Sequence, residues 1–250
     1  DYSWKTTHSF DGSHLEIASY SYNFVTSWTY PLGNDNVAYW HTSSNTPIWK
    51  SKCKGDNNNV GYIWLLDVTA NGDRIFCIFS GGYSSTSRLV VWDEAGDVSW
   101  KDDDLSQTEG HSLSDIANVF AYCNIDASNT AKGLHFYEND TNKWVYSESC
   151  SETETTPDGQ YVLAGFEDKS IGLFNQASST PIATIENVSD RSGNGWGNGN
   201  LYFIGNTASH FAYVSVSKIK IYSLVTEDLV FAYNFSENYT TISSLGEYLG

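Results

Sequence analysis

The stretch that decides the fold is Leu89-Val-Val-Trp-Asp-Glu-Ala-Gly-Asp-Val-Ser-Trp-Lys101, a β-hairpin pattern that recurs along the chain. An apolar run ends in an aromatic residue, a polar turn follows, and a second apolar run returns. The first runs of the five copies occupy residues 37–40, 89–92, 134–137, 171–174 and 219–222, and the second runs occupy residues 47–50, 98–101, 143–146, 181–184 and 229–232. Five copies of one hairpin predict an all-β repeat protein.

A second recurring pattern precedes the hairpins. Asp1-Tyr-Ser-Trp-Lys-Thr-Thr-His-Ser-Phe-Asp-Gly12 aligns without a gap with Gly61-Tyr-Ile-Trp-Leu-Leu-Asp-Val-Thr-Ala-Asn-Gly72. The same turn returns at Gly159 and Gly246, each 87 residues after the last. That spacing is two units of about 44 residues, and intermediate units occur where this period requires them. Each turn is followed by a strand with apolar or small residues on both faces, which predicts an inner strand.

Four strands per unit and a period of about 44 residues are typical of a β-propeller. A single four-stranded antiparallel blade exposes both faces, so each blade must stack on its neighbours. We expect one propeller domain with five complete blades at about residues 1–60, 61–109, 110–149, 150–194 and 195–239, and the start of a sixth at 240–250. Because a ring must complete its last blade, more chain after residue 250 or strands from a neighbouring molecule are expected.

The hairpin at residues 89–101 and its copies resemble the repeats of the quinoprotein-like and WD40-like propeller superfamily. The resemblance covers nearly the whole chain and implies the propeller architecture. The Trp-Asp pair of WD40 repeats occurs once, as Trp92-Asp93, and neither the Asp-box of sialidases nor a quinoprotein cofactor set is present. Catalytic and cofactor-binding residues are therefore not carried over from the family. The sequence predicts no enzyme and no cofactor.

The aromatic residues are expected to form the core of this propeller. Aromatic residues make up 15% of the chain, and Met is absent. This composition is typical of strands and turns. The aromatic residues that end the third strands and the tryptophans of the fourth strands are expected to fill the wedges between blades.

The formal net charge of −17 disfavours nucleic acid and anionic membranes as partners. No apolar run approaches the roughly 20 residues of a membrane span, so no membrane insertion is expected. The charge has two interpretations: a soluble β surface that resists edge-to-edge pairing, or a site for calcium or a basic partner. The acidic run Lys101-Asp-Asp-Asp104 lacks the spacing of a calcium loop and is expected to be a solvated loop.

The four cysteines show no C-x-x-C spacing, which disfavours a zinc or redox motif. Two disulfides or four buried thiols are the alternatives. Proximity in the sequence favours Cys53 with Cys77 and Cys123 with Cys150.

Four sequons begin at Asn139, Asn187, Asn234 and Asn238. Composition alone would produce about 4.5 such triplets, so their number carries no information. Their placement favours glycosylation, because Asn139 lies in an expected hairpin turn and the others lie in or near connections between repeats. Glycans and disulfides together predict an extracellular or cell-surface protein.

Two segments are candidates for interaction. An insertion at residues 20–33 carries Phe24, Trp28 and Tyr30, which are typical of an interface. Trp196 lies in the glycine-rich segment 192–200, which is either a flexible connection or a contact loop that stacks on a sugar or a protein. The histidines fit no metal-ligand spacing, so no metal site is predicted; they are His8, His14, His41, His111, His135 and His210.

Three functions fit these observations. The first is an extracellular structural or adhesive propeller, a glycosylated subunit of a cell-surface layer or fibre that binds other protein subunits as a homo-oligomer or filament. The second is a monomeric propeller that binds carbohydrate or protein through Trp28 or Trp196. The third is an enzyme with acid and base carboxylates at the central channel, which spacing along a repeat protein does not reveal.

Overall fold

The computed structural model contains five four-stranded antiparallel sheets. All regular secondary structure in the described part of the chain is β-strand. The described residues are 3–8, 14–20, 37–41, 43, 45–51, 62–69, 72–80, 87–105, 108–114, 119–124, 133–139, 141–188, 199–205, 208–215 and 218–234. The expected all-β fold with five blades of four antiparallel strands is confirmed. The expected sixth blade at residues 240–250 lies outside the described residues.

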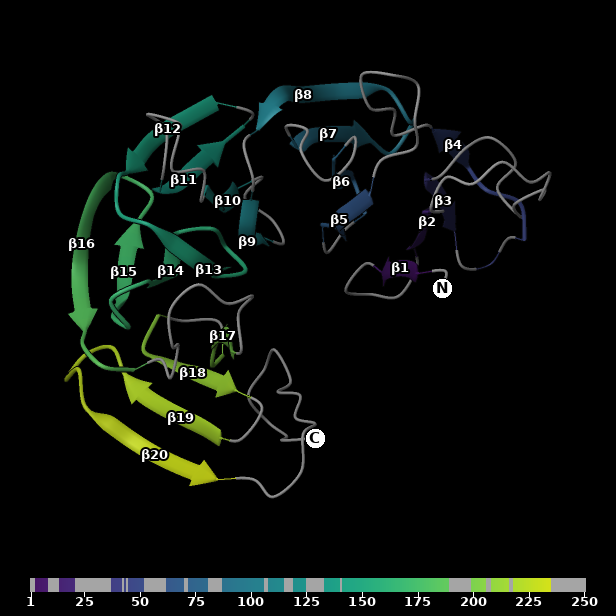
Figure 1. Cartoon of the computed structure of the whole chain (residues 1–250). Coiled ribbons are helices and arrows are strands. Elements are labelled where there is room, and N and C mark those ends of the chain that lie inside the picture. Colours follow the sequence, from purple (N-terminus) through teal and green to yellow (C-terminus); the bar gives the residue numbers. More distant parts are fainter. Residues whose placement is uncertain are drawn as a thin grey trace. The chain divides into compact units, whose positions relative to one another are not determined.

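The chain divides into two compact units, Asp1–Gln107 and Thr108–Gly250. In the first unit, one sheet consists of β1 (Ser3–His8), β2 (His14–Tyr20), β3 (Val37–His41) and β4 (Trp49–Ser51), and the other of β5 (Tyr62–Val68), β6 (Arg74–Ser80), β7 (Ser87–Asp93) and β8 (Val98–Leu105). Strands adjacent in the chain are adjacent in each sheet, as Figure 1 shows.

The second unit contains three sheets with the same strand order (Figure 1). The third sheet has β9 (Thr108–Leu113), β10 (Val119–Asn124), β11 (Gly133–Glu138) and β12 (Thr141–Tyr146); the fourth has β13 (Cys150–Thr155), β14 (Tyr161–Phe166), β15 (Ile171–Asn175) and β16 (Ser178–Ile185); the fifth has β17 (Gly199–Phe203), β18 (His210–Ser215), β19 (Lys218–Ser223) and β20 (Leu229–Asn234).

The acidic run at residues 101–104 belongs to a strand, so the expected loop is wrong. These residues lie in β8, where Leu89 of β7 pairs with Asp102 and Ser87 pairs with Leu105. The ladder pairs Lys101 and Asp102 with Val90 and Leu89 and resumes at Leu105 across a bulge that contains Asp103 and Asp104.

Apolar clusters between successive sheets form the core of each unit. In the first unit, one cluster joins Tyr39 of β3 to Ile75 and Trp92 of the second sheet. In the second unit, one cluster joins the third and fourth sheets and another joins the fourth and fifth. The strands β10 and β14 carry the buried apolar residues on both faces that the sequence predicted for inner strands.

A hydroxyl side chain closes three of the hairpins between first and second strands. The hydroxyl oxygens of Thr69, Ser114 and Thr156 each accept a hydrogen bond from the backbone N–H five residues later, at 3.0, 3.0 and 3.1 Å. All three hydroxyl residues are buried, so each supplies an acceptor for a backbone N–H inside the hairpin. In the fifth sheet, Ile204 occupies the corresponding position without a hydroxyl.

The residue after the third-strand aromatic often caps the next turn with its side chain. Oδ1 of Asp93 accepts hydrogen bonds from two backbone N–H groups, at 2.9 and 3.0 Å. Asn175 Oδ1 accepts one at 3.0 Å, and His41 Nδ1 and Ser223 Oγ each accept one at 3.2 Å. These short side chains explain why a polar residue follows the aromatic.

Candidate interaction surface

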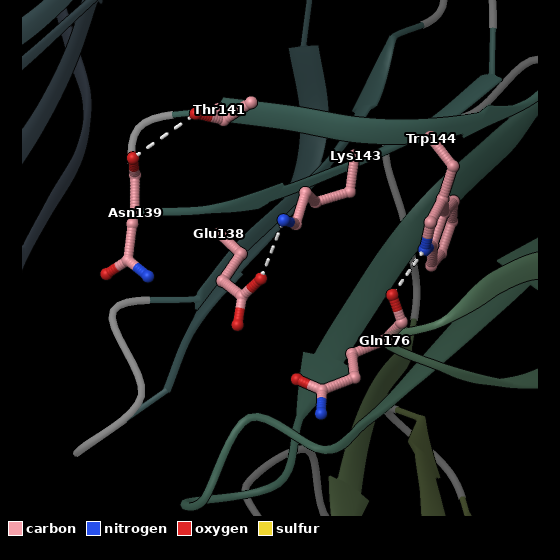
Figure 2. A network of polar contacts seen from close by, with 6 residues as sticks. All are labelled: Glu138, Asn139, Thr141, Lys143, Trp144 and Gln176. Carbon is pink, nitrogen blue, oxygen red and sulfur yellow. Dashed lines mark hydrogen bonds and ion pairs between the residues drawn. The ribbon is translucent and has the colours of Figure 1, made fainter.

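Trp144, on the outer strand of the third sheet, packs against the fourth sheet. Its ring lies parallel to Phe136, with centroids 4.8 Å apart and planes inclined by 5°. It also contacts Phe174, the aromatic residue that ends the third strand of the next sheet, at 5.6 Å. Its Nε1–H donates a hydrogen bond to the carbonyl oxygen of Gln176 at 3.1 Å (Figure 2). We call such a contact, between a fourth-strand side chain and the third-strand aromatic residue of the next sheet, an outer joint.

The first unit contains an outer joint of the same kind. Trp49 of β4 contacts Trp92 of β7, with ring centroids 5.6 Å apart. The turn after β7 reaches the same ring, because a Cβ on Gly96 would lie 2.7 Å from Trp49 Cγ. Gly96 also has φ +87°, so both the close approach and the backbone require glycine there. The expectation that third-strand aromatics and fourth-strand tryptophans fill the wedges is met at both joints.

Strand register identifies the position that supplies the outer joint in every sheet. In each sheet, this fourth-strand residue pairs with the residue just before the third-strand aromatic. The pairs, with the fourth-strand residue first, are Trp49 with Tyr39, Trp100 with Val91, Trp144 with Phe136, Ala183 with Leu173, and Phe231 with Ile221. Ala183 packs against the cluster that contains Tyr222 of the fifth sheet. Phe231 is therefore the fifth-sheet equivalent of Trp144.

The outer strand of the fifth sheet is exposed along its whole length, unlike its counterparts in the other sheets of this unit. Leu229 is 51% exposed and pairs with Tyr222 before a β-bulge. Beyond the bulge, Phe231 and Tyr233 pair with Ile221 and Ile219, share the other face, and are 41% and 57% exposed. The inner part of that face is buried, including Ala212 and Ile219. The exposed apolar area is thus confined to β20. We call Leu229, Phe231 and Tyr233 the β20 row.

The matching position in the third sheet, Tyr146, shows how a filled joint affects a neighbouring tyrosine. Tyr146 lies two residues after Trp144 and contacts Phe174 at 5.1 Å and Phe166 at 5.4 Å. Burial is the largest cause that raises the pKa of its phenol, and the carboxylates of Glu148 and Asp168 raise it further. The ring therefore stays neutral at physiological pH and contributes packing, not charge.

Comparison with known proteins shows a similarity to a mouse protein. Striatin of Mus musculus, a WD40-repeat protein, is 26% identical over 152 residues, which cover 57% of this chain and 19% of striatin. No family model matches. The chain thus spans less than a fifth of the length of this relative. Together with the repeated four-stranded sheets, the similarity is consistent with a WD40-like propeller.

Three of the four predicted sequon asparagines lie in the described chain, and all three are exposed. Asn139 occupies the β11–β12 turn with φ 47°, beside the ion pair between Lys143 and Glu138 at 3.0 Å (Figure 2). Asn187 lies just after β16, and Asn234 ends β20. Asn238 is outside the described residues. Occupancy of these sequons stays a prediction.

The two predicted disulfides have different outcomes. Cys123 of β10 and Cys150 of β13 form a disulfide with Cα atoms 5.3 Å apart, which links the third sheet to the fourth. Cys77 is buried in the first unit. Cys53 lies outside the described residues, so its pairing with Cys77 stays a prediction.

The segments that the sequence singled out for interaction lie outside the described residues: Phe24, Trp28, Tyr30 and Trp196. Within the described ranges, no group of three or more His, Cys, Asp or Glu side chains is placed to hold a metal ion. His135 is buried and stacks on Tyr122 at 4.7 Å. No helix in this part of the chain is long and apolar enough to cross a membrane.

The sequence predicts a fourth strand at residues 229–232 but does not single out the β20 row. Phe231 carried no predicted role, because the expected wedge residues were third-strand aromatics and fourth-strand tryptophans. The sequence shows that position 231 is apolar. Whether its side chain is buried depends on what packs against β20, which the sequence of the strand itself does not reveal.

Proposed function

We propose that this protein is a non-enzymatic propeller that binds other protein subunits outside the cell, as a glycosylated structural or adhesive component of a cell-surface layer or fibre. The observation that carries this proposal is the β20 row, three exposed apolar side chains on one strand. Contiguous exposed apolar residues are typical of protein interfaces. The similarity to the WD40-repeat protein striatin supports a scaffold role over a catalytic one.

The extracellular part of the proposal is supported by two independent features. The Cys123–Cys150 disulfide is typical of proteins that fold in an oxidising compartment. The exposed asparagines of three sequons leave room for glycans on the surface. Asn139 is the best candidate of the three, because it lies in a tight turn that projects from the sheet (Figure 2).

Electron microscopy of the protein isolated from its source, with glycopeptide mass spectrometry of the same sample, tests this function. We expect ordered layers or fibres and a glycan on Asn139. Asn142 is a matched internal control, because it is exposed in the same hairpin but begins no sequon. Unmodified, discrete monomers would overturn the proposal.

A further inference from the structure

The outer joint has two halves, and in the part of the chain that the structure describes each half is uncovered at one place. The donor half is the fourth-strand side chain, which is partly buried in Trp49, Trp144 and Ala183 but exposed in Phe231. Phe231 also makes no ring contact with any described aromatic residue. Among the described residues, it is a donor without an acceptor.

The acceptor half is the aromatic residue that ends a third strand. These residues are buried in the second to fifth sheets, where Trp92, Tyr137, Phe174 and Tyr222 are at most 8% exposed. Trp40, at the end of β3, differs because it is only partly buried and has no ring contact with a described residue. The turn that follows it is exposed at His41, Ser43 and Asn45. In filled joints this turn lies against the donor ring, as Gly96 does against Trp49 and Gln176 against Trp144.

The two uncovered halves lie on opposite faces of their sheets. Side chains alternate along a strand, and Tyr39 belongs to the cluster that faces the second sheet, so Trp40 lies on the other face. Tyr222 likewise belongs to the cluster that faces the fourth sheet, whereas Ile221, the partner of Phe231, belongs to a separate cluster. A donor surface and an acceptor surface that differ from each other produce head-to-tail association.

We propose that Phe231 and Tyr233 of the β20 row of one molecule pack on Trp40 and the β3–β4 turn of a second copy, which repeats between molecules the outer joint found within them. This inference rests on the proposed function and names the partner as another copy of this chain. Trp40 fits Phe231 because the filled joints pair an aromatic donor with an aromatic acceptor at 5.6 Å in both units. Since each molecule carries one donor and one acceptor, the association does not end at a dimer.

Complementary variants of the full 250-residue chain test this arrangement by sedimentation velocity over a concentration series. The wild type should grow beyond dimers as concentration rises. Phe231→Asp and Trp40→Asp should each weaken association at least tenfold, because a carboxylate would be desolvated in the joint. An equimolar mixture of the two variants should form dimers and nothing longer, because only one intact donor–acceptor pair is available.

Ala232→Asp is the matched control. Ala232 is exposed and pairs with Lys220, whereas Phe231 pairs with Ile221, so Ala232 points to the opposite face of β20. It should associate like the wild type. Near-UV circular dichroism verifies folding of each variant, and Trp40→Thr replaces Trp40→Asp if the charged variant is unfolded.

Each opposing result has a distinct meaning. A wild type that stays monomeric overturns the joint between copies, and a mixture that stays monomeric shows that the two halves do not meet across molecules. Loss of association in Phe231→Asp but not in the Trp40 variants assigns β20 to a different acceptor. If microscopy of native material still shows glycosylated layers while the joint variants assemble normally, this inference fails and the proposed function survives.

Discussion

Trp144 and Phe231 occupy the same register position in two sheets of one unit, yet their surroundings differ completely. Trp144 lies between Phe136 and Phe174 and donates a hydrogen bond to Gln176. Phe231 is 41% exposed. The difference teaches that the repeat specifies an apolar side chain at this position, and that contact with the next sheet decides whether this side chain is buried or exposed. A blade face that no described sheet covers is left with exposed apolar residues.

The sharpest test of this comparison removes one ring from each region. Phe174→Ala should lower the free energy of unfolding by about 3–5 kcal/mol, the usual cost of emptying a buried phenylalanine site. Phe231→Ala should change it by less than about 1 kcal/mol in dilute solution, because little packing is lost. Urea denaturation followed by tryptophan fluorescence measures both. A large loss in Phe231→Ala at low concentration would show that β20 is already covered in the single molecule.

The second prediction concerns the disulfide that strengthens the filled joint. Cys123 and Cys150 enclose a loop with a sequence separation of 27 residues. Replacing both with alanine should lower the stability of the second unit by about 2–4 kcal/mol, through greater freedom of the unfolded chain. Thermal unfolding of the variant and of the reduced wild type should give matching losses. An unchanged midpoint would mean that the joint is held by Trp144 and its aromatic neighbours alone.

The sequence predicted the repeated elements well and their environments poorly. Residues 89–101 show the hairpin because apolar alternation and turn residues are local signals. The aromatic positions Trp92 and Phe174 were expected in the wedges, and they are buried there. Phe231 was not distinguished from them, because its exposure depends on a contact between sheets. The acidic run was predicted to be a solvated loop because it lacks the spacing of a calcium loop, whereas its pairing with β7, which the run alone does not reveal, makes it part of a strand.

The hydroxyl that closes the first hairpin gives a third prediction, which compares the fourth sheet with the fifth. Thr156 Oγ1 accepts the backbone N–H of Tyr161 at 3.1 Å, whereas Ile204 has no hydroxyl in the fifth sheet. Thr156→Val should cost about 1–3 kcal/mol, because a buried donor loses its side-chain acceptor at nearly constant volume. Thr184→Val, on the exposed outer strand, is the control and should be nearly neutral. Equal effects in urea denaturation would contradict a specific role for this hydroxyl.

The smallest expected effect belongs to the ion pair beside Trp144. Lys143 and Glu138 lie 3.0 Å apart, with side chains 43% and 30% exposed (Figure 2). Solvent screening limits such a pair, so Lys143→Gln should lower stability by less than about 1 kcal/mol. The difference from the wild type should vanish in about 0.5 M salt, where the screening length is only a few ångströms. A loss that persists in salt would assign the contribution of Lys143 to the packing of its aliphatic stem. Trp144 is the next residue along β12. A small, salt-sensitive effect of Lys143→Gln would therefore mean that the Trp144 joint is stabilised mainly by the aromatic contacts with Phe136 and Phe174.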